Sequence, residues 1–172
     1  MSLALLAVAS GGFIAMEGVS YATHRWIMHG PGMRWHRSHH VPAQGRFEKN
    51  DLFPVFFSTI GFLVFLSASL TATTWMYWLG AGITGYGLVY MLVHEVYIHR
   101  RLPCPISDRA ALDWMRDSHE IHHLYGGEPY GMLLPVVTGD LRRRAAAHRQ
   151  PPAVPASGTP RRDKMRRSRT RL

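Results

Sequence analysis

Ten of the eleven histidines in this 172-residue chain fall into four short groups, and these groups repeat in order. Each half of the chain carries a pair of histidines five positions apart, followed by a triplet with the spacing His-x2-His-His. Neutral imidazole is the most common nitrogen ligand of transition metals in proteins. One ion takes about four to six ligands, so ten imidazoles predict two metal ions. The predicted ligands are His24, His29, His36, His39, His40, His94, His99, His119, His122 and His123.

The spacings indicate how these side chains could converge. On a helix, positions i, i+3 and i+4 share one face, so each triplet directs three imidazoles toward a common point. Residues five apart differ by about 140° around a regular α-helix, so each pair needs a frayed or widened helix end. Helix-breaking residues follow both pairs: Gly30–Gly32 comes after His29, and Pro103 and Pro105 come after His99.

The spacing alone does not choose the metal, because affinity by itself favours copper or zinc over iron. The eleventh histidine, His148, stands alone in a basic segment. We predict that it has no role in the site, since an isolated histidine is usually a surface residue.

The elements that must position the histidines are predicted to cross a membrane. Residues 52–93 contain no Asp, Glu, Lys, Arg or His over 42 positions. As a helix they would extend about 63 Å, roughly twice the hydrocarbon core of a bilayer. We therefore predict two spans joined by a turn near Thr71–Thr74, where Trp75, Tyr77 and Trp78 suit a membrane–water interface.

A third span is predicted in residues 3–23, LALLAVASGGFIAMEGVSYAT. Ala7–Ser10 resembles a signal-peptide cleavage site, but no basic residue precedes Arg25 and the apolar run continues beyond this point. We interpret the segment as an uncleaved first helix. The apolar stretch at 132–139 is too short to span, so we expect it to enter the interface or to pack under the histidines.

Three spans would place both histidine clusters, 24–40 and 94–123, on one side of the membrane. The first span ends before His24, and the third ends before His94. The loop opposite the clusters has no charge, whereas basic residues gather beside the histidines, so the positive-inside rule places the clusters in the cytoplasm. The predicted fold is an all-α membrane protein with three transmembrane helices, a fourth remaining open, and a cytoplasmic histidine-rich cap.

The basic character of the chain is confined to its C-terminal part. After Asp140 the sequence has eleven Lys or Arg and one acid, a net +10, whereas residues 1–140 carry nine basic and ten acidic groups, a net −1. We divide the chain into a membrane domain, 1–140, and a basic tail, 141–172, predicted to be disordered and to rest on anionic lipid. Nucleic-acid binding is the alternative, but interleaved aromatic residues are missing. The single Cys104 excludes an internal disulfide and a Cys-based zinc site.

The residues that carry these patterns also resemble a known family. The segment HRSHHVPAQGRFEKNDLFPV, 36–55, is similar to the first triplet region of bacterial β-carotene hydroxylases, including the run Phe47–Phe53. HEVYIHRRLP at 94–103 resembles the second pair of that family, and HEIHH at 119–123 its second triplet. The resemblance covers about residues 16–137. The wider kin are histidine-box membrane hydroxylases and desaturases that act on fatty acids and sterols.

The resemblance implies that residues 1–140 form a non-haem di-iron monooxygenase. Such an enzyme would use O2 to hydroxylate C3 of the β-ionone rings of β-carotene, giving zeaxanthin through β-cryptoxanthin. The implied cofactors are two iron ions, and the implied partners are a carotenoid in the bilayer and a ferredoxin with its NAD(P)H-dependent reductase. A dinucleotide-like match at Gly80–Gly85 lies inside the uncharged run, where small residues for membrane-helix packing explain it better.

Several further residues are expected near the histidines. Glu17 lies in an apolar span, two turns before His24 on the same face, so we expect it to hydrogen-bond a ligating imidazole; helix contact or snorkelling is the alternative. The other acidic candidates for this role are Asp51, Glu95, Asp117 and Glu120. The candidate substrate-lining residues, which plain helix packing or lipid contact also explains, are Phe53, Phe56, Phe57, Tyr86 and Tyr90.

Two features depart from the family pattern. After the last triplet the chain reads LYGGEPYGMLLP, where many relatives carry a Cys-containing stretch, and three spans stand where relatives are often drawn with four. Three other functions stay open: a sterol or fatty-acid hydroxylase or desaturase, a histidine-rich metal transporter, and a zinc hydrolase. Transport histidines would lie near the bilayer midplane, and a zinc hydrolase would need fewer ligands.

Overall fold

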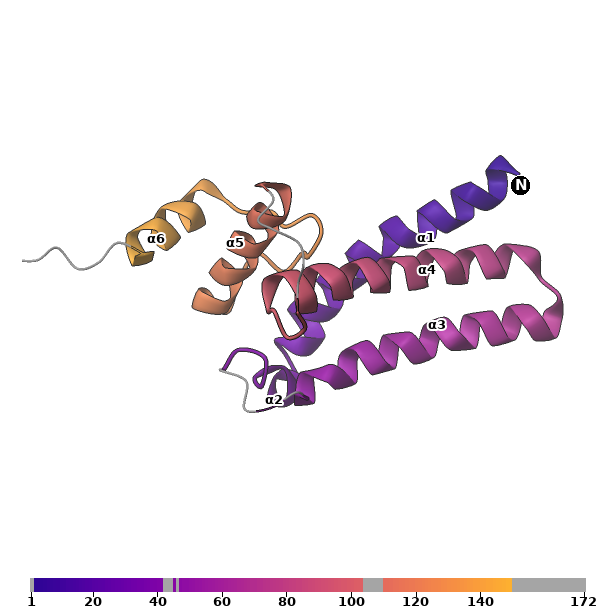
Figure 1. The fold of residues 1–172 in the computed structure, drawn as a ribbon, viewed down its shortest axis with the longest axis horizontal. Coiled ribbons are helices and arrows are strands. Elements are labelled where there is room, and N and C mark those ends of the chain that lie inside the picture. Colours follow the sequence, from indigo (N-terminus) through magenta and orange to yellow (C-terminus); the bar gives the residue numbers. More distant parts are fainter. Residues whose placement is uncertain (1, 42–44, 46, 104–109, 150–172) are drawn as a thin grey trace, which may run out of the picture.

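A computed structural model describes residues 2–41, 45, 47–103 and 110–149, and this part of the chain is helical between its connecting segments (Figure 1). Pro105 and Cys104 lie outside the described residues, as does most of the predicted tail. The elements in chain order are α1 (Leu3–Ala22), the π-helix η1 (Thr23–Met28), α2 (Met33–His36), the 3-10 helix η2 (Lys49–Asp51), α3 (Leu52–Thr71), α4 (Thr74–Met91), the π-helix η3 (Leu92–Ile98), α5 (Ala110–Tyr125) and α6 (Gly139–Arg149).

Within the described residues, three helical stretches are long and apolar enough to cross a membrane: Leu3–Met28, Lys49–Thr71 and Thr74–Ile98. This confirms the three predicted spans and makes the chain a multi-pass membrane protein. In Figure 1 α4 lies between α1 and α3 and packs against both. The N-terminus and the α3–α4 turn lie at one end of this bundle, and α2, α5 and α6 lie at the other.

The α1–α4 contact depends on glycine. A Cβ atom at Gly82 of α4 would collide with the backbone oxygen of Ala9 on α1, and one at Gly12 would meet Leu79. A Cβ at Gly80 would press against the Phe65 ring of α3. The small residues at 80–85 therefore serve close helix packing, as predicted from their place in the apolar run.

The turn between α3 and α4 falls where the sequence predicts it. Ala72 adopts a left-handed backbone conformation with φ of 51°, and α4 begins at Thr74. The hydroxyl of Thr71 donates to the Ser67 carbonyl oxygen at 2.8 Å, one helical turn earlier.

Both histidine pairs lie at helix ends widened into π-helix, which confirms the predicted deviation from regular α-helix. The backbone N–H of His29 donates to the His24 carbonyl at 3.0 Å, and that of His99 donates to the His94 carbonyl at 2.9 Å. A π turn closes over five residues instead of four, so it brings positions i and i+5 onto one face. The five-residue spacing of each pair therefore matches the local helix type.

The cap at the histidine end is formed by α2, η2, α5 and the segment that follows α5. The amphipathic α5 places His119 and His122 in the interior and leaves Asp117 and Glu120 exposed. The tail prediction needs correction at its start, because residues 141–149 continue as helix α6 instead of being disordered. Arginine and alanine favour helix, which explains why residues 141–149 are helical.

Candidate metal centre

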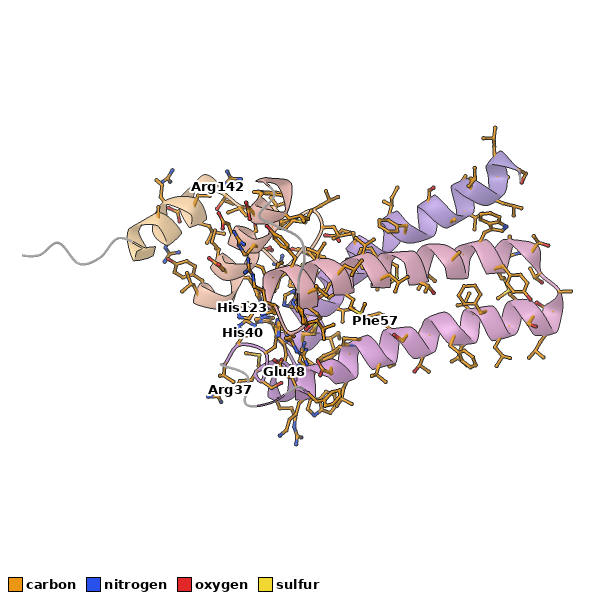
Figure 2. All side chains as sticks on the ribbon, viewed as in Figure 1. Arg37, His40, Glu48, Phe57, His123 and Arg142 are labelled. Atoms are coloured by element: carbon orange, nitrogen blue, oxygen red, sulfur yellow. The ribbon has the colours of Figure 1, made fainter. Side chains whose placement is uncertain are left out.

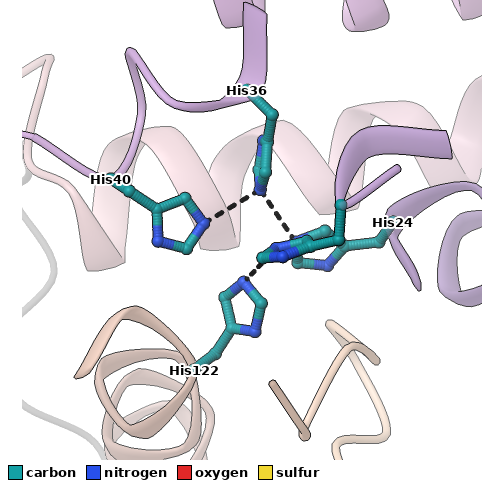
Figure 3. Close-up of side chains that lie close together, drawn as sticks. His24, His36, His40 and His122 are labelled. Carbon is teal, nitrogen blue, oxygen red and sulfur yellow. Dashed lines mark hydrogen bonds between the residues drawn. The ribbon is translucent and has the colours of Figure 1, made fainter. Parts of the chain in front are cut away.

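The histidines gather into two groups at one end of the bundle. The ligating nitrogens of each group lie within 4.8 Å of one another. Figure 3 shows part of the first group, with His24, His36, His40 and His122 pointing toward a common centre. The first group consists of His24, His29, His36, His40 and His122, and the second contains His39, His99, His119 and His123.

The tenth predicted ligand, His94, borders the second group. Its ring centroid lies 4.6 Å from the rings of both His39 and His99, and 4.7 Å from that of His119. The structure therefore brings all ten histidines together, five in the first group and four in the second, with His94 beside the second.

The middle histidine of each triplet belongs to the other half's centre. The first centre takes its pair and two triplet members from the first repeat, and it takes His122 from the second. In the second centre, His39 of the first repeat completes a set that otherwise comes from residues 94–123. The two centres therefore have matching ligand patterns, in keeping with the repeated pair and triplet of the sequence. Each centre also contains histidines from both halves of the chain.

The Nδ1 atoms of several ligands are held from outside the centre. The Nδ1–H of His24 donates to the Tyr130 carbonyl oxygen at 3.0 Å, and that of His122 donates to the Gly127 carbonyl at 2.6 Å. His36 Nδ1 pairs with the Asn50 side-chain oxygen at 2.8 Å. Because a carbonyl only accepts, these bonds place the proton of the neutral ring on Nδ1 and leave the Nε2 lone pair facing inward.

The inward Nε2 atoms face one another at short range. His24 Nε2 lies 3.1 Å from His36 Nε2, and His29 Nε2 lies 3.0 Å from His122 Nε2. In the second group His99 Nε2 lies 3.0 Å from His119 Nε2. In the His24–His36 pair both rings carry their proton on Nδ1, so the two Nε2 lone pairs repel at this distance, and a cation between them removes the repulsion. The separation fits two ligands of one ion, each about 2.1 Å from it.

A buried nitrogen without a partner supports the same conclusion. Among the described residues, the Nε2 of His39 is buried and makes no hydrogen bond. A buried polar atom without a partner is costly, and a metal ion would satisfy this one. The donor set, the inward lone pairs and this atom together fit bound transition-metal ions.

Electrostatics keep the cluster neutral and ready to ligate. Burial, assisted by neighbouring imidazoles, lowers the pKa of His40 to about 4, that of His99 to about 3 and that of His123 to about 2. Burial likewise lowers the pKa of His39 and His119 far below the usual value. At neutral pH the rings are therefore uncharged, which is the form that binds metal.

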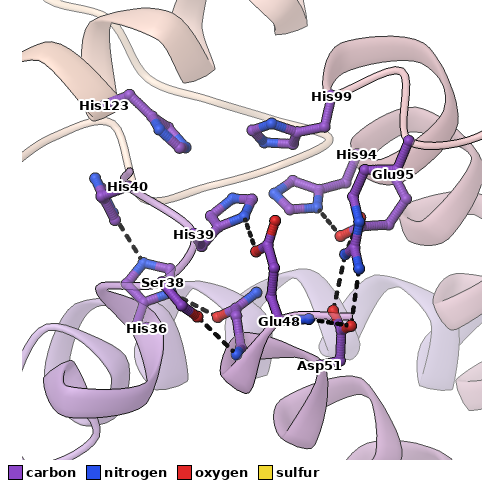
Figure 4. A network of polar contacts seen from close by, with 12 residues as sticks. His36, Ser38, His39, His40, Glu48, Asp51, His94, Glu95, His99 and His123 are labelled. Carbon is purple, nitrogen blue, oxygen red and sulfur yellow. Dashed lines mark hydrogen bonds and ion pairs between the residues drawn. The ribbon is translucent and has the colours of Figure 1, made fainter. Parts of the chain in front are cut away.

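A chain of charged groups supports the second centre (Figure 4). Glu95 accepts from His94 Nδ1 at 2.7 Å and from Arg101 at 2.7 Å. Both carboxylate oxygens of Asp51 accept from Arg101 at 2.8 Å, so Asp51 is linked to His94 through Arg101 and Glu95. Glu95 thus stands where the sequence predicts it, and Asp51 acts one step further away.

Two residues in this region were missed by the sequence reasoning. Asn50 holds His36, and Glu48 lies 3.4 Å from His39 Nδ1. Both belong to the run Phe47–Phe53, whose likeness to the family was the available signal. The carbonyls of Gly127 and Tyr130 carry no such signal, because any residue type supplies a backbone oxygen.

The prediction that Glu17 hydrogen-bonds a ligating imidazole is wrong. The carboxylate accepts hydrogen bonds from the Tyr86 hydroxyl and from the backbone N–H groups of Met132, Leu133 and Leu134, and among the described residues it binds no imidazole. The donors come instead from the segment after α5 and from Tyr86 of α4, so the alternative of a contact between helices applies to this carboxylate. Asp117 and Glu120 are exposed, and their proposed support of the ligands stays a prediction.

The aromatic candidates do not form one lining. Phe53 packs against Trp35 with ring centroids 6.2 Å apart, and Phe56 is 60 % exposed on α3. Figure 2 shows Phe57 on the cap-proximal part of α3. Tyr90 comes closest to a centre, since its ring centroid lies 5.1 Å from that of His94, and Tyr86 binds Glu17.

A cavity of about 310 Å³ opens between the two triplet regions, away from the membrane spans. His40 of the first centre contributes to its wall together with His39, His99 and His123 of the second. Figure 2 shows that His40, Glu48 and His123 lie at the cap end of the molecule. The remaining lining residues are Val41, Glu48 and Arg101.

Comparison with known proteins agrees with this site. The family model for fatty acid hydroxylases matches residues 9–140. Since this is most of the chain, the protein belongs to the fatty acid hydroxylase family.

Within this family, the chain is similar to several β-carotene hydroxylases. A beta-carotene hydroxylase of Pseudescherichia vulneris is 41% identical, over 86% of this chain and 93% of its own. One from Pantoea ananas is 40% identical, over 67% of this chain and 66% of its own. A chloroplastic beta-carotene 3-hydroxylase of Haematococcus lacustris is 35% identical, over 75% of this chain and 42% of its own. No solved structure matches the chain significantly.

Proposed function

We propose that this protein is a carotenoid hydroxylase that adds a hydroxyl group at C3 of each β-ionone ring, converting β-carotene to zeaxanthin through β-cryptoxanthin. The observation that carries the proposal is the pair of histidine groups, one of five and one of four with His94 beside it, at one end of three apolar spans. The beta-carotene hydroxylases to which the chain is similar support the choice of substrate.

The ten histidines would hold two iron ions. Iron, when bound, supplies the O2-dependent oxidation that an unactivated C–H bond requires, which acid–base side chains cannot supply. The protein's own part is to bury the imidazoles at one end of the bundle and to hold the Nδ1 atoms of four of them with Tyr130, Gly127, Asn50 and Glu95. This shell fixes ring orientation before any ion arrives.

The substrate would reach the site from the bilayer. A carotenoid dissolves in hydrocarbon, and the three spans lead directly from the hydrocarbon depth to the histidine end. Tyr90, next to His94, is the aromatic candidate best placed to meet an incoming ring. The other candidates, Phe53, Phe56, Phe57 and Tyr86, remain proposals as lining residues.

Electrons would come from a separate protein, a ferredoxin supplied by an NAD(P)H-dependent reductase. The glycines at 80–85 serve helix packing, so this match supplies no nucleotide site of the chain's own. The cavity between the triplets gives a water-side approach to ligands of both centres. We propose that the donor faces this opening and that the cap, with the basic tail, is cytoplasmic.

Expression in a β-carotene-accumulating bacterium tests the function. We expect chromatography to show β-cryptoxanthin and zeaxanthin with the intact chain, none with His122→Ala, and both with His148→Ala as the matched histidine control. Unchanged β-carotene beside a well-expressed, membrane-inserted intact chain would contradict the proposal. Accumulated metal in those cells without pigment change would favour the transporter instead.

A further inference from the structure

A carboxylate inside the first span fastens the segment that follows α5. Glu17 accepts from the N–H groups of Met132 at 3.0 Å, Leu133 at 3.2 Å and Leu134 at 3.0 Å, and from the Tyr86 hydroxyl at 2.7 Å. A charged group in a membrane span is costly unless it is hydrogen-bonded, and four donors satisfy this one. We call residues 126–134 the strap.

A second carboxylate fastens the middle of the strap. Glu128 accepts from the Tyr21 hydroxyl at 2.7 Å and from Arg25 at 2.9 Å, both on the α1–η1 helix. It also accepts from the N–H of Tyr130 at 3.1 Å. The strap is therefore tied to the first span at two points, on either side of Tyr130.

Between these two points the strap touches the first centre. Its Gly127 and Tyr130 carbonyls accept from the Nδ1 atoms of His122 and His24. The Tyr130 ring centroid lies 5.4 Å from that of His24, 5.1 Å from that of His29 and 5.3 Å from that of His122. All three histidines belong to the first group, so these contacts of the strap are with one centre of the two.

We infer that Glu17 is a positioning residue for the first metal centre, acting through the strap on His24 and His122. The carboxylate fixes where residues 132–134 sit, and these fix the Tyr130 carbonyl that orients the His24 ring. Glu128 shares this work from the other side. The second centre, supported by Glu95 and Arg101, does not depend on Glu17. The inference rests on the proposed function in that it assumes two bound ions.

The test uses the purified full chain in detergent, with Glu17→Ala, Glu17→Gln and Glu128→Gln beside Asp140→Asn. Asp140 is an exposed acid that pairs with Arg143 on α6, so it serves as the charge-matched control. Hydrogen exchange of the metal-free protein reports whether the strap is fastened. Titration with Co(II) against a chelator reports the affinity of each of the two ions.

We expect Glu17→Ala to speed hydrogen exchange at residues 132–134. We also expect it to lower the affinity for one of the two Co(II) ions by about 10–100-fold and to leave the affinity for the other as in the wild type. Glu17→Gln keeps one acceptor oxygen and should show the same pattern with a smaller change. If Glu17→Ala does not fold, Glu17→Gln decides the matter.

Equal weakening of both ions would overturn the inference, because it would indicate a general structural role. Wild-type affinity for both ions in Glu17→Gln together with faster exchange would overturn it too. Failure of the proposed function would be read separately, as absence of hydroxylated pigment, since the Co(II) titration requires no substrate or turnover.

Discussion

At the scale of the residue, the exchange of the middle histidines decides which side chain serves which centre. His39 and His40 are neighbours in sequence, yet their rings belong to different groups. On a helical turn, adjacent residues point about 100° apart, so two neighbours can serve two centres that lie side by side. His122 and His123 divide in the same way.

This division predicts the outcome of combined substitutions. His40→Ala with His122→Ala removes two ligands of the same group, so we expect the chain to lose one ion. His40→Ala with His39→Ala removes one ligand from each group, so we expect the affinity for both ions to fall. The loss should exceed the factor of about 10–100 that follows when a ligand only loses its supporting hydrogen-bond partner. Metal analysis after chelator treatment measures both variants, and equal ion counts in the two would contradict the assignment.

At the scale of the element, the two π-helices and the glycine contact explain how the ligands reach their places. The pair on η1 extends α1, and the pair on η3 extends α4, so the spacing between α1 and α4 sets the distance between His24 and His94. A Cβ atom at Gly82 would force these helices apart at Ala9.

We therefore expect Gly82→Ala to destabilise the fold by about 1–3 kcal/mol, the usual cost of overpacking, and to lower metal occupancy. Gly87→Ala is the matched control, because a Cβ at Gly87 meets nothing within 4 Å. Thermal unfolding in detergent and metal analysis measure both variants. The same melting temperature for Gly82→Ala as for Gly87→Ala would show that the close contact is not required.

The elements also show why some features could be predicted and others could not. Two spans explain the length of the uncharged run 52–93 better than one, and the five-residue spacing of His24 and His29 indicates a frayed or widened helix end. The strap could not be predicted, because its contacts to the ligands are backbone carbonyls and its place depends on tertiary packing. The sequence shows that a carboxylate at Glu17 lies in an apolar span and is therefore costly. It does not show which N–H and O–H groups donate to that carboxylate, so the predicted imidazole partner is wrong.

In the molecule as a whole, the histidine groups lie at one end of the bundle, and basic residues are exposed at the same end. The described cap carries exposed Arg34, Arg37 and Lys49, whereas the α3–α4 turn at the other end has no charged residue. Basic residues remain on the cytoplasmic side during membrane insertion. The proposed orientation, with the cap in the cytoplasm, rests on this distribution of charge and not on the histidines.

Labelling from outside the cell checks this orientation. In a Cys104→Ser background, we expect Thr74→Cys, at the exposed start of α4, to react with a membrane-impermeant maleimide in spheroplasts. Lys49→Cys, exposed on the cap, should react only after the membrane is permeabilised. The reverse pattern would place the histidine centres outside. A cytoplasmic donor protein could not then reach the cavity beside His40 and His123, and reduction would have to come from the opposite compartment.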